Sequence, residues 1–414
     1  MLFSMQSSGG SVSMVKRIAV LDSGKEWGGG INSLFELMRR IDRRSWDCTV
    51  ILYQDLAKGN DSTLSRELAA IGIPTVILPS LEPSVSFKIM KHASKAVSFF
   101  SRTIRKRLLF DVERRFRIMP RSEQIAVALR EIGADLLYMN NQPSSNLEGS
   151  LAAEHVRIPV IQHCRKVTTL NPFEREVANR ALSRMICVSE GLADAYVAQG
   201  VDAGRCAVVP NGIDLTPASL TDPATVRQEL GVGAGACLVG TVASFLPVKR
   251  LADFVRAAAE VVTRRGQDVV FLMVGDGPER SSLENLASRL GVGDRLAFAG
   301  FRSDALSVIN AMDIFVLTSE REGMPRVVLE AMLMGKPVVG TRVTGTMELV
   351  VDGESGFLVP VGEPKRVADA LELLAADPAL RSRQGACGRQ RVMEQYSIEA
   401  YVSGVERVFR EVLG

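Results

Sequence analysis

The sequence predicts an α/β fold made of two doubly wound halves, and three observations support this. Short apolar, β-branched runs alternate with stretches of helical periodicity along most of the chain, which is typical of parallel strands joined by crossover helices. The alternation forms two series, separated by the turn residues 210–214. At 414 residues the chain is also long for a single core.

The first series follows a tail over residues 1–14, which is rich in Ser and Gly and has no apolar leader region. An N-terminal domain is expected over 15–212, with helices near 31–40 and 62–71. Its strands are expected at 17–22, 49–53, 75–78, 135–139, 160–163 and 185–189.

The second series predicts a C-terminal domain over 213–396. Its strands are expected at 237–242, 269–274, 296–298, 313–318 and 337–341. Residues 397–414 form a candidate C-terminal helix, which could cross back to the first domain.

Composition excludes several classes of function. A net charge of +3 is too small to indicate a nucleic-acid partner. The six cysteines contain no Cys-x-x-Cys pair, which argues against a zinc site and for a reducing compartment. No run of 18 apolar residues is present, so no membrane-spanning helix is expected.

Residues 319–334 hold the most informative stretch, between the strands expected at 313–318 and 337–341. Glu322 lies in the loop at the carboxyl end of the first strand, where open α/β sheets bind ligands. Glu330 is the one charged residue of an otherwise apolar helix over 327–334. It either pairs with Arg326, in the less favourable order on a helix, or binds ligand hydroxyls.

The two glutamates lie in EGMPRVVLEAM, which is followed by GKPVV, TGTMELV and DGESGFLVP. These motifs resemble the signature of the retaining glycosyltransferases of family 4, which have the GT-B fold. The resemblance runs from Lys16 onward and is weakest over 79–121. It implies two Rossmann-like domains facing across a cleft, and transfer of a sugar from a nucleotide-sugar donor to an acceptor hydroxyl with retention.

The resemblance also implies which residues form the site. Glu322 would contact the donor sugar, Glu330 the ribose hydroxyls, Lys249 the diphosphate and His163 the sugar hydroxyls. The donor-binding set is Gly29, Gly30, Ser244, Lys249, Gly275, Phe301, Arg302, Glu322, Gly323, Met324, Pro325 and Glu330. The acceptor-side set is Gly28, Asn140, Asn141 and Arg165.

One position departs from the family pattern. The loop after the strand at 237–242 usually carries an Arg five positions before its Lys, and here that position is Ser244. Arg250 or Arg326 could substitute for the missing charge. No Asp-x-Asp motif occurs in the chain, so we expect no metal and no cofactor.

The stretch over 79–121 is basic and laced with apolar residues, among them Phe99 and Phe100. Such a helix binds an anionic membrane surface, or it is an ordinary amphipathic surface helix. The first alternative predicts a cytoplasmic enzyme that is peripheral on the inner face of the membrane and extends a glycan or lipid-linked acceptor.

Two other functions stay open at this stage. A nucleotide-sugar 2-epimerase has the same architecture but acts without an acceptor. A degenerate sugar-nucleotide binder would explain Ser244 as a sign of decay. Formation of a transferred product would separate the predicted activity from both.

Overall fold

The structure is a computed structural model that describes residues 15–24, 28–58, 62–81, 102–217, 219–233, 235–265 and 269–414, without the side chains of 102–106 and 265. The predicted tail, and residues 82–101 of the basic stretch with Phe99 and Phe100, lie outside the described residues. Two compact units are present, and each is described by itself. Unit 1 comprises Met1–His163, Leu170–Met185 and Val408–Gly414, and unit 2 comprises Cys164–Thr169 and Ile186–Arg407.

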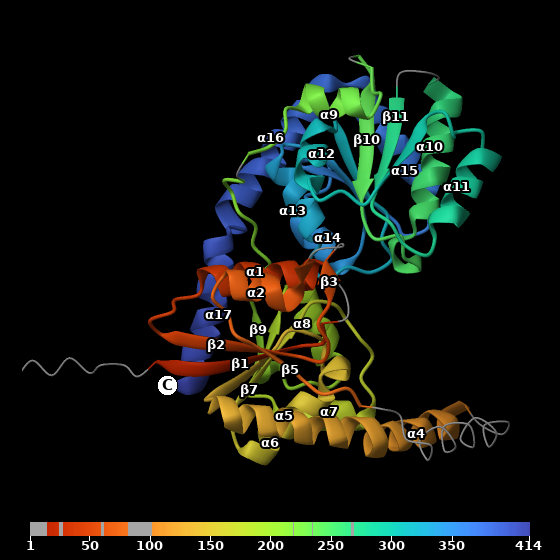
Figure 1. Cartoon of the computed structure of the whole chain (residues 1–414). Coiled ribbons are helices and arrows are strands. Elements are labelled where there is room, and N and C mark those ends of the chain that lie inside the picture. Colours follow the sequence, from red (N-terminus) through yellow and green to blue (C-terminus); the bar gives the residue numbers. More distant parts are fainter. Residues whose placement is uncertain are drawn as a thin grey trace, which may run out of the picture. The chain divides into compact units, whose positions relative to one another are not determined.

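A seven-stranded sheet begins in unit 1, with the order β5-β2-β1-β6-β7-β8-β9 (Figure 1). The pairings β1–β2, β1–β6, β2–β5 and β6–β7 are parallel. The strands are β1 (Lys16–Asp22), β2 (Trp46–Leu52), β5 (Thr75–Ile77), β6 (Leu136–Met139), β7 (Val160–Cys164), β8 (Arg184–Cys187) and β9 (Cys206–Val208). A separate two-stranded antiparallel sheet pairs β3 (Ala57–Lys58) with β4 (Ser62–Thr63).

A six-stranded sheet lies in unit 2, with the order β12-β11-β10-β13-β14-β15, and all of its pairings are parallel. The strands are β10 (Cys237–Val242), β11 (Val269–Val274), β12 (Leu296–Gly300), β13 (Ile314–Leu317), β14 (Val338–Thr341) and β15 (Gly356–Val359). Phe254 of helix α10 (Leu251–Arg265) and Phe271 of β11 pack edge to face in the core beneath this sheet.

Crossover helices connect the strands, as parallel pairing requires. Before residue 200 they are α1 (Gly29–Arg40), α2 (Leu64–Ala70), α4 (Arg102–Glu113), α5 (Met119–Ile132), α6 (Leu147–Val156), α7 (Pro172–Ala181) and α8 (Glu190–Val197). A π-helical turn, Arg114–Ile118, joins α4 to α5.

The later helices are α9 (Pro223–Glu229), α10 (Leu251–Arg265), α11 (Arg280–Arg289), α12 (Ala305–Ala311), α13 (Arg326–Leu333), α14 (Thr344–Leu349), α15 (Pro364–Ala376), α16 (Pro378–Gln395) and α17 (Ile398–Leu413). Short 3-10 turns lie at Pro143–Ser145, Ala203–Arg205 and Pro247–Lys249. In unit 1, Phe409 of α17 packs edge to face against Trp46 and Tyr138.

The predicted fold class is confirmed, because both sheets are parallel and doubly wound. Every predicted strand exists, with ends that differ by up to three residues. Pro325, a member of the predicted donor-binding set, is the residue that precedes α13. Strands β3, β4, β9 and β15 were not predicted, and the first three are only two or three residues long.

Candidate functional site

The donor-side residues gather at one edge of the six-stranded sheet. From β10 the chain runs outward to β11 and β12, then returns to β13 on the other side of β10. The strand order therefore reverses between β10 and β13, and ligands of doubly wound sheets bind at the carboxyl ends of strands at such a point. Lys249 follows β10 and Glu322 follows β13.

These two side chains form an ion pair. Nζ of Lys249 lies 2.6 Å from Oε1 of Glu322, and both side chains are largely buried. Such a pair can bind a ligand that has both an anionic group and hydroxyl groups. The cation can bind the anionic group, and the carboxylate can accept hydrogen bonds from the hydroxyls. The two catalytic candidates of unit 2 are thus together.

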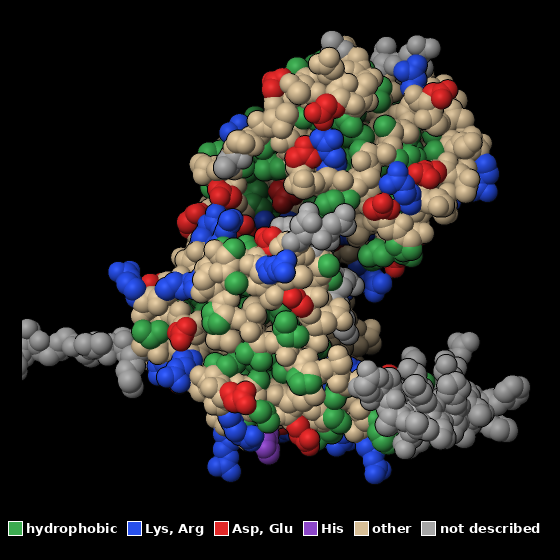
Figure 2. Space-filling view, viewed as in Figure 1, with side chains coloured by type: hydrophobic (Ala, Val, Ile, Leu, Met, Phe, Trp, Pro, Cys, Tyr) green, Lys and Arg blue, Asp and Glu red, His purple; other side chains and the backbone are tan. Residues whose placement is uncertain are grey.

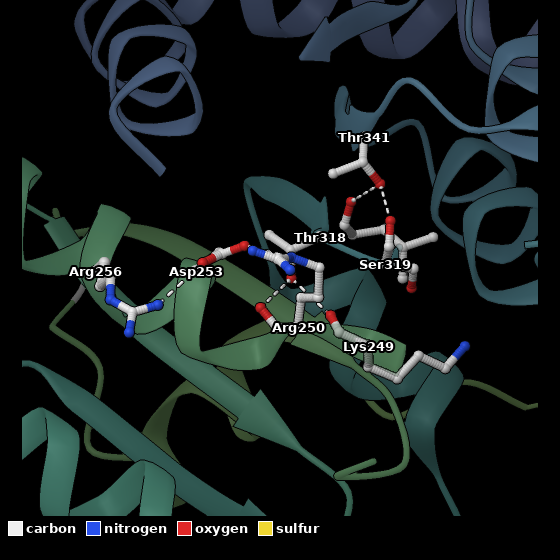
Figure 3. Close-up of polar contacts among 8 residues, drawn as sticks. Lys249, Arg250, Asp253, Arg256, Thr318, Ser319 and Thr341 are labelled. Carbon is white, nitrogen blue, oxygen red and sulfur yellow. Dashed lines mark hydrogen bonds and ion pairs between the residues drawn. The ribbon is translucent and has the colours of Figure 1, made fainter. Parts of the chain in front are cut away.

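Three backbone tethers join the segments that carry the pair. The hydroxyl of Thr318 donates to the carbonyls of Lys249 and Arg250, at 3.0 and 3.2 Å. The N–H of Glu320 donates to the carbonyl of Val248. Figure 3 shows dashed lines from the Thr318 hydroxyl to the carbonyls of Lys249 and Arg250, and the Lys249 side chain extending away from the Arg250–Asp253 pair.

Glu330 lies in α13 with an imperfect partner. Its Oε1 is 4.0 Å from Nη2 of Arg326, while Nη1 of Arg326 donates to the carbonyl of Gly212 at 2.9 Å. Burial raises the pKa of Glu330, and Arg326 only partly offsets that effect. The ion-pair alternative is present, but the pair is long and leaves the carboxylate poorly compensated, and binding of ligand hydroxyls stays a prediction.

The loop that carries Glu322 is clamped from both sides. A side chain at Gly323 would overlap the carbonyl of Arg165, and one at Gly345 would overlap the carbonyl of Gly323. Nδ2 of Asn211 donates to the carbonyl of Met324 at 2.9 Å, and its Oδ1 accepts from Arg165 at 2.9 Å. Arg165, predicted on the acceptor side, thus lies within unit 2 beside the donor loop.

The turns after β11 and β12 meet at the same edge. The N–H of Gly275 donates to the carbonyl of Gly300. Gly275 has φ +128°, and a side chain there would overlap the carbonyl of Ala243. Phe301 is 78% exposed and open to a ligand. The guanidinium of Arg302 is held by Asp304 and Glu229, which raise its pKa.

The residues predicted in unit 1 meet at the reversal point of the first sheet, where β1 and β6 are neighbours. Nδ2 of Asn140 donates to Asp22 at 2.8 Å and to the carbonyl of Gly30, and Asn141 donates to the same carboxylate of Asp22. Gly28 precedes α1, and Gly29 is its first residue. Asp22 organises this loop and was missed; its signal is an acidic residue between an apolar strand and a glycine-rich turn.

His163 has a different setting from the one expected. Its side chain is fully buried in unit 1, with Nδ1 2.5 Å from the hydroxyl of Tyr138. The ring packs edge to face against that of Tyr138. A contact with donor hydroxyls stays a prediction.

Comparison with known proteins identifies the family. Residues 224–391 match the family described as Glycosyl transferases group 1, and residues 27–217 match Glycosyltransferase Family 4. The chain belongs to the group 1 glycosyltransferases.

Relatives extend this result. The chain is 35% identical over 192 residues to the Bacillus anthracis N-acetyl-alpha-D-glucosaminyl L-malate synthase, covering 46% of this chain and 50% of that one. It is 35% identical over 174 residues to the Rhizobium meliloti lipopolysaccharide core biosynthesis glycosyltransferase LpsE, covering 42% and 50%. The chain spans about half the length of these curated relatives.

A solved structure shows the same fold over nearly the whole chain. It is that of Anabaena HepE in complex with UDP and glucose, with a TM-score of 0.75 and 24% identity, covering 96% of this chain and 100% of that one. The GT-B fold is therefore confirmed.

For a group 1 glycosyltransferase, the cations near the donor loop are few. Ser244 is exposed in the β10–α10 loop. Arg250, one expected substitute, is bound to Asp253 at 2.7 Å and has the left-handed backbone conformation, with φ 47°. Arg326, the other, donates to Gly212 and lies near Glu330. Lys249 is thus the one predicted diphosphate ligand in contact with Glu322.

The expectation of a metal-free site stays a prediction. Among the residues that the structure describes, no three His, Cys, Asp or Glu side chains gather where they could hold a metal ion. We expect activity to survive EDTA, because Lys249 supplies the charge that a cation would otherwise bring to a diphosphate. A rate measured with and without EDTA checks this, and a loss that Mg²⁺ or Mn²⁺ restores would contradict the prediction.

Proposed function

We propose that this protein is a retaining glycosyltransferase that moves a sugar from a nucleoside-diphosphate sugar to an acceptor hydroxyl. The observation that carries the proposal is the Lys249–Glu322 pair at the reversal point of the six-stranded sheet. Family membership supports it, and so does the fold shared with HepE, whose structure holds UDP and glucose.

Each group has a distinct role in this proposal. Lys249 leaves Glu322 and stabilises the negative charge that develops on the departing diphosphate. Glu322 accepts hydrogen bonds from the donor sugar, and Glu330 from the ribose. The bond between the anomeric carbon and the phosphate oxygen breaks, the acceptor oxygen bonds to the same face of that carbon, and the acceptor proton passes to the leaving phosphate.

A nucleotide-sugar screen tests the donor part of the proposal. A sugar nucleotide at 100 times its Kd stabilises a protein by about 2.7 kcal/mol, so the correct donor should raise the Tm clearly above the values with other bases. Incubation of that donor with candidate acceptors should then give a transferred product. Donor binding without any product would favour the degenerate binder, and sugar rearrangement without acceptor the epimerase.

We further propose that the acceptor is a glycan in the assembly of a lipid-linked or surface polysaccharide, at the inner face of a membrane. The relation to a lipopolysaccharide core enzyme supports this assignment. No helix in the described part of the chain is long and apolar enough to span a bilayer.

The described side chains of the basic stretch, those of residues 79–81 and 107–121, include both basic and apolar ones. Phe110 packs against Phe173 in a small core cluster, and Arg114 lies over the same ring. Leu108 and Met119 remain exposed. Figure 2 shows Lys and Arg side chains along the edge that α5 and α6 form, with hydrophobic and acidic side chains among them. Basic charge beside exposed apolar groups suits an anionic leaflet.

Vesicle flotation tests the membrane part. We expect the protein to float with vesicles that contain anionic lipid and to be released by salt, because salt screens the surface charge. Changing Arg105, Lys106 and Arg107 to Ser should weaken binding, since each basic residue near the surface contributes about 1 kcal/mol. The matched control changes Lys365, Arg366 and Arg383, exposed residues of unit 2, to Ser. If the unmodified protein stays in the soluble fraction at low salt, the stretch is an ordinary surface helix, and the result favours a soluble acceptor.

A further inference from the structure

We propose that Thr318 is a positioning residue for Lys249, and that its hydroxyl fixes the cation where the donor diphosphate binds. This inference rests on the proposed function and assigns to it a residue that the family motifs did not single out. Thr318 itself touches no donor atom in this proposal; it acts through the backbone of the next segment.

Geometry separates Thr318 from an ordinary buried hydroxyl. Its side chain is 2% exposed at the carboxyl end of β13, and the hydroxyl is shared between the carbonyls of Lys249 and Arg250. Both carbonyls belong to the end of a 3-10 turn, Pro247–Lys249, rather than to a strand or a long helix. The hydroxyl therefore ties the irregular loop after β10 to the neighbouring strand.

The tethered backbone is also one that needs outside support. Arg250 has φ 47° and ψ 40°, in the left-handed region that a side chain with a Cβ disfavours. This conformation ends the turn, and α10 begins at the next residue, Leu251. Asp253 holds the Arg250 side chain at 2.7 Å, and Thr318 holds its carbonyl, so the bend is fixed from two directions.

The tethers connect the two segments that carry Lys249 and Glu322, the two members of the ion pair. Thr318 and Glu320 bond to residues 248–250, and Glu322 lies two residues beyond Glu320 on the same segment. Loss of the Thr318 hydroxyl would leave the carbonyls of Lys249 and Arg250 without this donor and loosen the loop that carries Lys249. The cation would then sample positions in which it is not aimed at the diphosphate.

Thr341 provides a matched control. Its side chain is also 2% exposed, and its hydroxyl also lies between two carbonyls, those of Leu317 and Ser319 (Figure 3). Neither carbonyl belongs to the Lys249 loop: Leu317 ends β13, and Ser319 lies on the segment that leads to Glu322. Thr318→Val and Thr341→Val thus remove the same group from similar surroundings, and only the first loosens Lys249.

The test compares binding of UDP, ADP and GDP with that of the corresponding nucleosides, by calorimetry. Thr318→Val should weaken binding of the diphosphate that the protein prefers on the order of tenfold, the size of one buried hydrogen bond, and leave nucleoside binding unchanged. Thr318→Ser should restore binding, and Thr341→Val should weaken it less than Thr318→Val does, because Thr341 makes no bond to the Lys249 loop. Thermal unfolding of each variant establishes that it folds.

A double-mutant cycle decides whether the effect runs through Lys249. In a Lys249→Met background, Thr318→Val should cause no further loss of diphosphate binding. Additive losses, an equal loss of nucleoside binding, or an equal effect of Thr341→Val would each overturn the inference while the proposed function stands. If Lys249→Met alone leaves diphosphate binding unchanged, the proposed donor site is wrong and the inference falls with it.

Discussion

Replacing Lys249 with Met should lower kcat by about 10²–10³-fold, the usual effect of removing one preorganised group that stabilises charge in a transition state. The expected loss is large because Ser244 brings no charge, and because Arg250 and Arg326 are bound elsewhere. Met keeps most of the apolar stem, so packing along the loop is retained.

Steady-state kinetics with saturating donor measure this effect. Lys365→Met is the matched control, since it removes the same charge from an exposed position of unit 2. A kcat for Lys249→Met within a factor of two or so of the unmodified protein would show that the diphosphate is neutralised by another group.

Replacing Glu330 with Gln should raise the donor KM by about 10- to 100-fold, because hydrogen bonds to a charged group contribute about 1.5–3 kcal/mol. The same change should not lower the Tm at pH 8. A carboxyl group whose folded-state pKa is raised stabilises the fold below its ordinary pKa, and this contribution is lost as the pH rises through the folded-state value. Above that pH range the buried, ionised carboxylate of Glu330 destabilises the fold, and replacement by the neutral Gln removes this destabilisation.

The two measurements separate a ligand-binding role from a structural one. If Glu330 serves mainly as the partner of Arg326, the Gln variant will lose Tm and keep its donor affinity. Donor binding by the unmodified protein should also weaken as the pH is lowered through the raised pKa, because the protonated carboxyl accepts hydrogen bonds less well. Glu354→Gln, at an exposed position, controls for the loss of one negative charge.

Sequence reasoning predicted the strands and the donor edge well, because both depend on local patterns. Buried parallel strands read as β-branched runs, and the carboxyl ends of such strands share one edge. The pattern placed Glu322 at that edge, the family resemblance assigned Lys249 to the donor diphosphate, and the structure brings the two side chains into contact. The poor compensation of Glu330 followed from its apolar helix neighbours.

The remaining features depend on tertiary contacts that no local pattern encodes. Whether His163 faces a ligand or the core depends on which face of β7 is covered, and the structure buries it beside Tyr138. Arg165 was placed on the acceptor side, but its partners Asn211 and Tyr401 come from distant parts of the sequence. The local pattern identified Thr318 only as a strand residue. Its role as a tether could not be predicted, because its hydroxyl partners lie 68 and 69 residues earlier in the chain.

The contacts around Asn211 also determine when the donor loop can form during synthesis. Nη2 of Arg165 donates to the hydroxyl of Tyr401 at 3.0 Å, and this bond forms only after Tyr401, 236 residues later, has been made. The N–H of Ile213 likewise waits for the carbonyl of Tyr396, and Ile213 pairs with Ser397. Contacts of such sequence separation close late. A ribosome-bound chain that lacks only residues 396–414 would therefore hold both glutamates and Lys249 without the support that shapes the loop between them.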